Sequence, residues 1–437
     1  MDTTNEDFFK NGVLGHPAGL FVLFFTEMWE RFSYYGMRVL LVLFLTSSIT
    51  GFNPGWGWDR KAALALYGTY ASLVYITPII GGWLADNKIG YKMAVVYGAV
   101  VMTLGHLFMA FETETFLYLG LLFLIIGNGL FKPNMTSIIS HMYKNHPEKK
   151  DGAFTLFYMG VNAGAFLGIL LCGTLGEKYS WSYGFGLAGI FMFLGMLQFY
   201  FAQPLFGHIG DKPKKETEAE KEANLSEILE EGETKLNHFT LVDKILMFVS
   251  ATLGILYVIN DPLYEITKMK GYANPINLFP FSIGDMPGKN VAIIVALFAF
   301  LTLITSRILR YAPVVRDRMI AVAVFAFFTV FFWASFEQAG GSMNIFAKDY
   351  TGRALVGGAA LTFKVINTLI YIIPLAIISW VLIKLILVSF SKIPVSNTIL
   401  GASFVIIWGI VLYLLYQEFI SNKTEIPASW FNILNSL

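Results

Sequence analysis

The chain has 437 residues, of which 56% are hydrophobic, 16% aromatic and only 14% charged, and its formal net charge is +1. This composition excludes an ordinary soluble globular protein and is typical of a protein that crosses a membrane many times. The small net charge provides no general attraction to nucleic acid, so we expect no nucleic-acid partner. The single cysteine, Cys172, excludes a disulfide within the chain, and we interpret it as a packing residue.

Apolar runs predict an all-α protein with a series of membrane-spanning helices. A polar arm (1–18) precedes six runs that predict a helical bundle over 19–206, at 19–47, 62–85, 91–111, 117–141, 153–175 and 184–203. The segment 207–240 is too charged for a membrane and is interpreted as a cytosolic linker. Two further helices are predicted within 241–310, at 242–260 and 290–308, and another within 311–345, at 319–339.

The last part of the chain has a different layout. Two apolar runs, 365–389 and 398–419, predict a helix pair within 346–425, and residues 426–437 begin a last apolar helix. About ten residues of that helix precede Leu437, whereas about 20 are needed to cross a bilayer. We therefore expect the chain to be a C-terminally truncated part of a longer protein.

Lysine and arginine predict the orientation of the chain. The loops 86–92, 143–151 and 306–318 are basic, whereas the loop 112–115 has no basic residue. Because basic loops face the cytoplasm, the amino terminus is expected to be cytoplasmic. The sequence thus predicts a multi-pass protein in the plasma (cytoplasmic) membrane, with the lipid bilayer as its surroundings.

The first span carries charges that a lipid-facing helix should exclude, namely Glu27, Glu30, Arg31 and Arg38. A central charge costs about 2.5–3.5 kcal/mol on insertion scales, so such residues usually face an interior or an aqueous cavity. Glu27 and Arg31 are four residues apart, and Tyr35 and Arg38 continue the same face. We expect this face to be functional; a cluster of ion pairs that only holds helices together is the alternative.

Two further apolar runs contain polar groups. Lys132 lies inside the fourth run, just before Pro133, and needs a partner that the first-helix glutamates could provide; extension of its side chain to the interface is the alternative. In the fifth run the Gly/Ala spacing of residues 157–168 (FYMGVNAGAFLG) allows close helix packing. Asn162 lies in that segment as a ligand contact or as an interhelical hydrogen-bonding group.

Two helix ends carry candidate residues. In residues 82–92 (GWLADNKIGYK), glycines permit close approach of helices, and Asp86 could cap a helix or pair with a basic group. This segment is either a gate latch or a plain turn. Glu337, the only acid of the span 319–339, lies near its outer end, where a solvated helix end is one interpretation.

Residues 27–38 (EMWERFSYYGMR) resemble the first-helix signature of the proton-dependent oligopeptide transporters, a branch of the major facilitator superfamily. Residues 82–92 and 157–168 resemble further signatures of this superfamily and family. The resemblance implies a major-facilitator-type helical bundle, with a complete first six-helix bundle and a partial second one. It implies that the segment 241–310 holds two extra helices, that 311–345 holds helix seven, that 346–425 is an inserted helix pair and that 426–437 is the start of helix eight. It assigns proton coupling to Glu27, Glu30, Arg31, Lys132 and Glu337, substrate binding to Arg38, Tyr34, Tyr35, Tyr75, Asn162 and Asn435, and gating to Gly82, Asp86, Gly90 and Lys92.

The function that this resemblance implies is proton-coupled symport of di- and tripeptides by alternating access, with protons as the coupling ion and no cofactor or metal. One alternative is the same fold with another small anionic substrate, such as nitrate. A second alternative is a non-transporting membrane sensor or scaffold. The sequence of such a protein would be expected to include a large soluble domain. An enzyme is not expected, because the few histidines, His106 and His141 among them, show no metal-ligand spacing.

Overall fold

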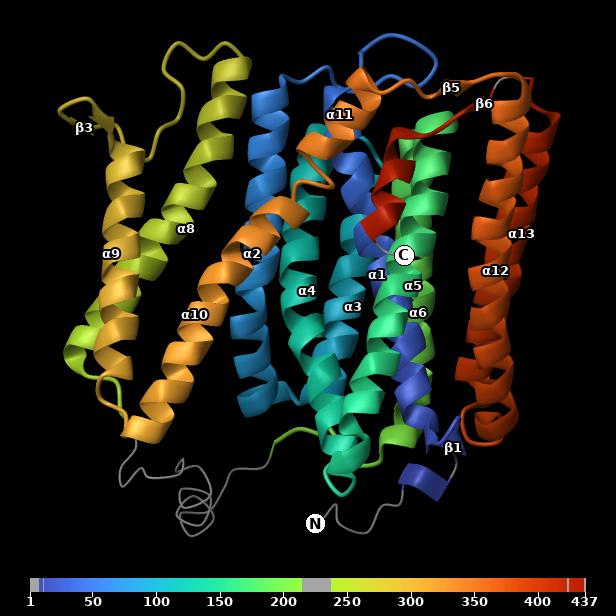
Figure 1. Ribbon diagram of the computed structural model, residues 1–437, viewed down its shortest axis with the longest axis horizontal. Coiled ribbons are helices and arrows are strands. Elements are labelled where there is room, and N and C mark those ends of the chain that lie inside the picture. Colours follow the sequence, from blue (N-terminus) through green and yellow to red (C-terminus); the bar gives the residue numbers. More distant parts are fainter. Residues whose placement is uncertain (1–7, 11, 214–236, 423, 436–437) are drawn as a thin grey trace. The chain divides into compact units, whose positions relative to one another are not determined.

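The computed structural model describes residues 8–10, 12–213, 237–422 and 424–435 (Figure 1). The first part of the chain contains η2 (Phe8–Lys10), β1 (Gly12–Val13), β2 (His16–Pro17), α1 (Ala18–Thr46), α2 (Arg60–Leu84), the π-helix η3 (Ala85–Ile89), α3 (Tyr91–Met109), α4 (Glu114–Met142), η4 (Pro147–Lys149), α5 (Lys150–Lys178), α6 (Trp181–Ala202) and η5 (Gln203–Phe206). The second part contains α8 (Leu241–Met269), β3 (Ser282–Ile283), β4 (Met286–Pro287), α9 (Gly288–Ile308), α10 (Pro313–Phe336), α11 (Ser342–Tyr350), β5 (Ala354–Leu355), α12 (Gly357–Ser389), α13 (Pro394–Ile420), β6 (Thr424–Glu425) and η6 (Ala428–Asn435).

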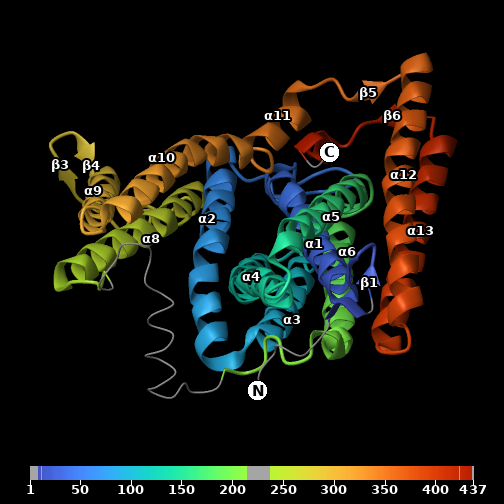
Figure 2. The ribbon, with the colours of Figure 1, turned by 60° about the horizontal axis from the view of Figure 1, so that its bottom comes forward.

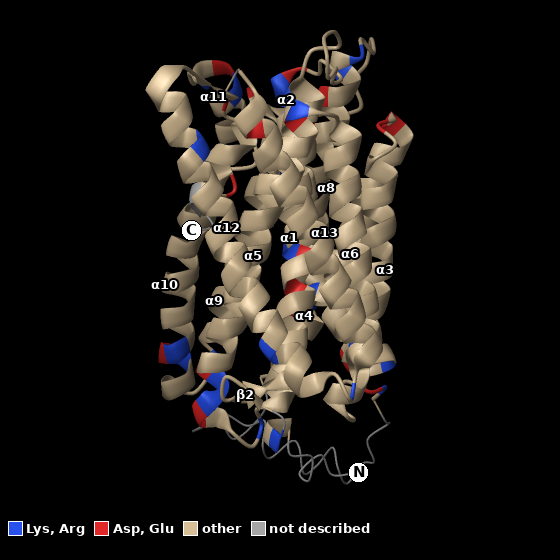
Figure 3. Cartoon of the chain, turned by 90° about the vertical axis from the view of Figure 1, so that its right-hand side faces the viewer, with Lys and Arg blue, Asp and Glu red and all other residues tan. Residues whose placement is uncertain are grey.

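The predicted class, an all-α polytopic membrane protein, is confirmed. Within the described residues, ten helices are long and apolar enough to cross a membrane. Helix α1 is not among these ten, although its 29 residues are sufficient for a span of about 30 Å at 1.5 Å per residue. Figure 3 shows that charged residues gather at the helix ends, apart from a small group at mid-height beside α1 and α4.

The chain forms two compact units. The first contains Met1–Gly57, Leu73–Pro213 and Ala339–Leu437, and the second contains Trp58–Ser72 and Lys214–Gln338. The sequence predicted consecutive segments, with α2 wholly in the first six-helix bundle. In the structure the first half of α2 instead lies in the same unit as α8 and α10. The hydroxyls of Thr69 and Tyr67 donate to the carbonyl oxygens of Val258 (2.7 Å) and Glu337 (3.1 Å), respectively.

Helix α1 is the core of the first unit and is buried along almost its whole length. It packs against α5 and α6, and the α5 contact depends on glycine. A Cβ atom at Gly160, Gly164 or Gly168 would lie 2.8, 2.1 or 2.2 Å from a carbonyl oxygen of α1. Because Cβ atoms do not approach oxygen so closely, the glycine spacing of α5 brings the two backbones into contact.

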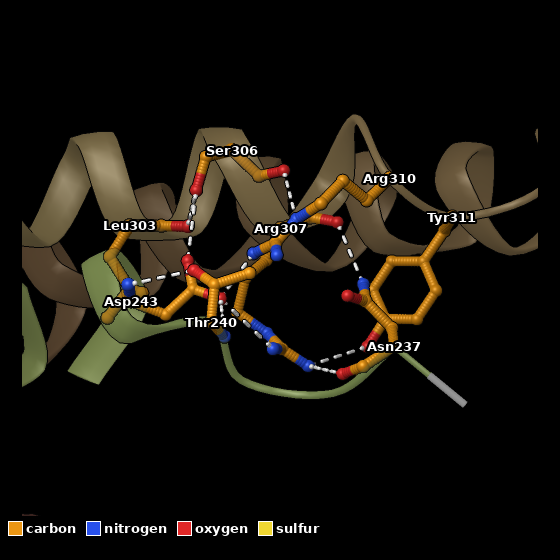
Figure 4. A network of polar contacts seen from close by, with 8 residues as sticks. All are labelled: Asn237, Thr240, Asp243, Leu303, Ser306, Arg307, Arg310 and Tyr311. Carbon is orange, nitrogen blue, oxygen red and sulfur yellow. Dashed lines mark hydrogen bonds and ion pairs between the residues drawn. The ribbon is translucent and has the colours of Figure 1, made fainter. Parts of the chain in front are cut away.

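The second unit contains the two extra helices, α8 and α9, which pack against each other. Thr240 and Asp243 form a capping box at the start of α8, and Asp243 also accepts a 2.6 Å hydrogen bond from Arg310, beyond the end of α9 (Figure 4). Arg307 donates to the carbonyl oxygen of Asn237 at 2.8 Å. This network fastens one end of the α8–α9 hairpin.

Helices α12 and α13 form the predicted inserted pair and run side by side in Figures 1 and 2. Strands β5 and β6 pair antiparallel and join the two ends of the insertion. Within the first unit, α13 packs against α6 and α1: Ser396 donates to the carbonyl oxygen of Gln198 at 2.8 Å, and the Phe404 ring lies 5.6 Å from the Trp29 ring.

Several helix limits differ from the predicted ones. Helix α10 begins at Pro313, six residues before the predicted 319, because Pro313 supplies a favourable first helical residue despite the nearby charges. The short helix α11 was not predicted. The expected eighth helix is a 3₁₀ helix, η6, as far as Asn435. Of the predicted arm and linker, residues 1–7, 11 and 214–236 lie outside the described part of the chain.

Candidate functional site

The acidic and basic residues at the middle of α1 form one connected cluster. Arg31 Nε lies 3.0 Å from Glu27 Oε1 and 2.9 Å from Glu30 Oε2. Both carboxylates are fully buried, whereas the Arg31 side chain keeps 11% of its surface exposed. An ion pair buried in this way needs hydrogen bonds on its remaining oxygen atoms, since desolvation of the charges is costly.

Helix α4 supplies two further polar contacts to these carboxylates. Lys132 Nζ forms an ion pair with Glu27 Oε1, and Asn128 Nδ2 donates a 3.3 Å hydrogen bond to Glu30 Oε1. Asn128 and Lys132 are four residues apart and therefore lie on the same helix face. The resulting cluster, Glu27, Glu30, Arg31, Lys132 and Asn128, holds two negative and two positive formal charges, so one added proton would leave it with net positive charge.

Arg38 and the two tyrosines lie further along α1. The Arg31 guanidinium carbon is 5.6 Å from the Tyr34 ring centre and 5.9 Å from that of Tyr35. The Arg38 guanidinium carbon is 5.5 Å from the Tyr35 ring centre. Tyr35 thus lies between the two guanidiniums, where its ring stabilises both positive charges. Arg38 itself is 97% buried, with a relative exposure of 3%.

The other predicted substrate residues lie on different elements. Asn162 of α5 is exposed, two residues from Gly160 and Gly164 at the α1 contact. Tyr75 of α2 is also exposed, with a relative exposure of 52%. The Asn435 side chain lies outside the described part of the structure. Glu337 follows the last residue of α10 and belongs to the second unit.

The predicted gate segment is the junction of α2, η3 and α3. Gly90 has a φ of 78°, which favours glycine, and a Cβ atom there would lie 2.6 Å from the Asp211 carbonyl oxygen. Lys92 Nζ lies 2.5 Å from Asp211 Oδ1 and donates to the Gly207 carbonyl oxygen at 2.8 Å. These contacts fasten the junction to the segment after α6.

Asp211 has a second partner, His208, at 3.0 Å. Partial burial acts to raise the pKa of Asp211, but the hydrogen bonds from Lys92 and His208 outweigh it and hold the pKa below its usual value. Asp211 was not predicted as a member of this site. Its sequence signal was weak, since it lies at the start of a charged segment that was interpreted as a linker.

Two further residues of the site were not predicted. Asn128 carries no charge, but its position four residues before Lys132 could have indicated it. The close approach at the end of α2 involves Gly81 rather than Gly82, because a Cβ atom at Gly81 would lie 1.9 Å from the Gly129 carbonyl oxygen. At Gly82 the nearest atom would be 3.6 Å away, which is an ordinary contact.

The apolar helices and the charges buried within α1 and α4 define a polytopic membrane protein with a polar site inside its helical bundle. A profile of the POT family matches residues 92–239. The "Uncharacterized transporter YclF" of Bacillus subtilis is 31% identical over 389 residues, which are 87% of this chain and 71% of that protein.

Two proteins described as peptide transporters are similar too. The "Peptide transporter YePEPT" of Yersinia enterocolitica is 33% identical over 372 residues, which are 84% of this chain and 67% of that protein. A crystal structure of a peptide transporter POT in complex with sulfate has a TM-score of 0.56 and 32% identity, covering 86% of this chain and 70% of that one. The chain belongs to the POT family of transporters, and its fold is of the major-facilitator type.

Proposed function

We propose that this protein is a proton-coupled symporter that imports di- and tripeptides by alternating access. The observation that carries the proposal is the buried cluster of Glu27, Glu30, Arg31 and Lys132 on two membrane helices. Peptide transport is the activity named for the Yersinia enterocolitica relative. Intramembrane ionisable residues usually mark substrate or ion pathways, because their desolvation would otherwise be selected against.

Proton coupling is proposed for the α1–α4 cluster, with Glu337 as a further proton site. Glu27 accepts from both Arg31 and Lys132, while Glu30 forms an ion pair with Arg31 and accepts a hydrogen bond from Asn128. Protonation of either carboxylate would weaken its ion pairs and leave an unbalanced positive charge. Such a change favours whichever conformation solvates or re-pairs the cations, which is how a proton can bias a two-state transporter.

Peptide recognition is proposed for Arg38, together with Tyr34, Tyr35, Tyr75, Asn162 and Asn435. A guanidinium can bind a carboxylate through two parallel hydrogen bonds, so Arg38 is suited to the peptide carboxyl terminus. The crystallised relative holds sulfate, another small anion. A small inorganic anion such as nitrate is therefore the alternative substrate.

Gating is proposed for Gly82, Asp86, Gly90 and Lys92. The Lys92–Asp211 pair and the close approach at Gly90 hold the α2–α3 junction to the end of α6 as one rigid element. Rigid-body rocking needs such fixed elements within each half of a transporter. We propose the cytoplasmic membrane as the location, with the amino terminus inside, and no bound cofactor besides the coupling protons.

Transport by the protein in proteoliposomes tests the proposal. Radiolabelled dialanine should accumulate above its external concentration when the outside is acidic and should only equilibrate without a pH gradient. Unlabelled dialanine should compete for uptake, whereas its C-terminally amidated form should compete poorly. Accumulation that is independent of the pH gradient would contradict coupling, and competition by nitrate but not by dialanine would favour the anion alternative.

A further inference from the structure

A cavity lies at the Lys178 end of α5, beside helices α12 and α13. It has a volume of about 430 Å³ and is formed by the Lys178 end of α5, the first turns of α12, the last turns of α13 and the start of η6. Its walls include the aromatic residues Tyr179, Phe363, Tyr371 and Trp430. A cavity of this size can hold a small organic group.

Three carboxylates line this cavity, and two of them are paired with other groups of the protein. Glu177 accepts from the backbone N–H groups of Ala428 (2.7 Å) and Ser429 (2.8 Å), at the start of η6. Glu425 is exposed and lies 3.0 Å from Arg353. These two acids therefore have structural roles, and their charges are compensated.

Glu418 differs from the other two acids. Its Oε2 atom accepts a 2.7 Å hydrogen bond from Asn367 Nδ2, while Asn367 Oδ1 accepts from Trp430 Nε1 at 3.2 Å. Its Oε1 atom is buried and has no hydrogen-bond partner among the described residues. Burial of a carboxylate oxygen without a hydrogen-bond donor costs desolvation free energy. A ligand that donates an N–H or O–H group to this atom would remove that cost.

The surroundings of Glu418 favour a positively charged ligand. Helix α13 ends at Ile420 and α5 at Lys178, so the partial negative charges of two helix ends meet the cavity. The aromatic walls can stabilise a cation through their ring faces. Lys178 is the cation among the lining residues, and it is exposed to solvent.

The ligand chemistry can be narrowed further. A metal ion would need several ligating side chains, but no group of three His, Cys, Asp or Glu residues in the described ranges could hold one. A quaternary ammonium has no N–H group for Glu418 Oε1. A primary ammonium offers both the positive charge and the donor.

We propose that this cavity is a binding site for a primary ammonium group, with Glu418 as its carboxylate partner and the aromatic walls around its carbon chain. The site is separate from the proposed peptide site and does not depend on transport. Its ligand is either a soluble amine or the headgroup of an ethanolamine lipid, and both present the same group to Glu418.

Calorimetric titration of the purified protein in detergent tests the site with 2-phenylethylammonium as the probe and 2-phenylethanol as its neutral match. Wild type should bind the amine, and Glu418→Gln should weaken binding at least tenfold. Glu425→Gln, which removes an equal charge from the same cavity wall, should change it less than threefold. Lys178→Gln should strengthen binding, because it removes a nearby positive charge at an exposed position.

Native mass spectrometry distinguishes the two sources. Retention of phosphatidylethanolamine over phosphatidylcholine, lost in Glu418→Gln, identifies a lipid; amine binding without that preference identifies a soluble ligand. Absence of amine binding to wild type, equal binding of the alcohol, or unchanged binding in Glu418→Gln overturns the proposal. If Glu418→Gln does not fold, a failure of Lys178→Gln to strengthen binding overturns it instead.

Discussion

Removal of one partner of the Lys132–Glu27 ion pair should destabilise the protein strongly, because the remaining charge loses its compensation in the interior. Glu27 is fully buried and the Lys132 side chain keeps 29% of its surface exposed. Removal of one partner from a buried pair lowers the free energy of unfolding by about 3–5 kcal/mol. Because Lys132 is partly exposed, we expect Glu27→Gln to lower it by about 3 kcal/mol, the lower value of this range. Lys132→Met should lower the free energy of unfolding by less, because Glu27 keeps its 3.0 Å contact with Arg31.

The double variant gives the decisive number. The double variant Glu27→Gln, Lys132→Met leaves no unpaired charge at this contact. The losses of unfolding free energy in the two single variants should therefore not add, and the coupling free energy should be about 1.5–3 kcal/mol. SDS-induced unfolding in mixed micelles, followed by far-UV circular dichroism, measures all four proteins of the cycle. Additive losses, within about 0.5 kcal/mol, would refute the reasoning that the two residues act as one buried pair.

Three further predictions concern other parts of the molecule. Arg38→Lys should weaken dipeptide binding about tenfold or more, since an ammonium cannot form the paired hydrogen bonds of a guanidinium, and equal binding in a titration would contradict that role. Gly164→Ala should lower the unfolding temperature because its Cβ atom would lie 2.1 Å from a carbonyl oxygen of α1, whereas Gly186→Ala, with 3.9 Å to its nearest atom, should not. The lowered pKa of Asp211 means that its contribution to stability is present above its unfolded pKa and is lost as the pH falls through its folded pKa. The difference in unfolding temperature between wild type and Asp211→Asn should therefore shrink below about pH 4, and a difference that is constant from pH 7 to pH 3 would contradict the ion pair with Lys92.

The helical class was predictable because long apolar runs indicate membrane-spanning helices. The position of the charged residues on one face of α1 was predictable as well, since residues three and four apart share a helix face. Their partners on α4 were predictable only in part. A charge inside a membrane helix is unusual, so Lys132 could be singled out from the sequence. The neutral amide of Asn128 could not be singled out by itself, and only the packing of α4 on α1 identifies the contact of Asn128 with Glu30.

Other features depend on tertiary contacts that no local pattern encodes. Successive residues of a helix are about 100° apart around its axis. Gly81 and Gly82 therefore contact different neighbours, although the sequence alone does not distinguish these two adjacent glycines. The nine residues of α11 and the two-residue strands β5 and β6 are too short for a periodic signal. The capping of η6 by Glu177 joins residues about 250 positions apart and is visible only in the fold.

Gradient-driven dipeptide accumulation by Glu30→Gln tests the central claim most directly. With an acidic outside, wild-type proteoliposomes should concentrate dialanine, whereas Glu30→Gln should fail to concentrate it and still exchange labelled for unlabelled peptide. Glu148→Gln, at an exposed position, serves as the matched control and should behave as wild type. Concentration of dialanine by Glu30→Gln to the wild-type level would contradict proton coupling through the α1–α4 cluster.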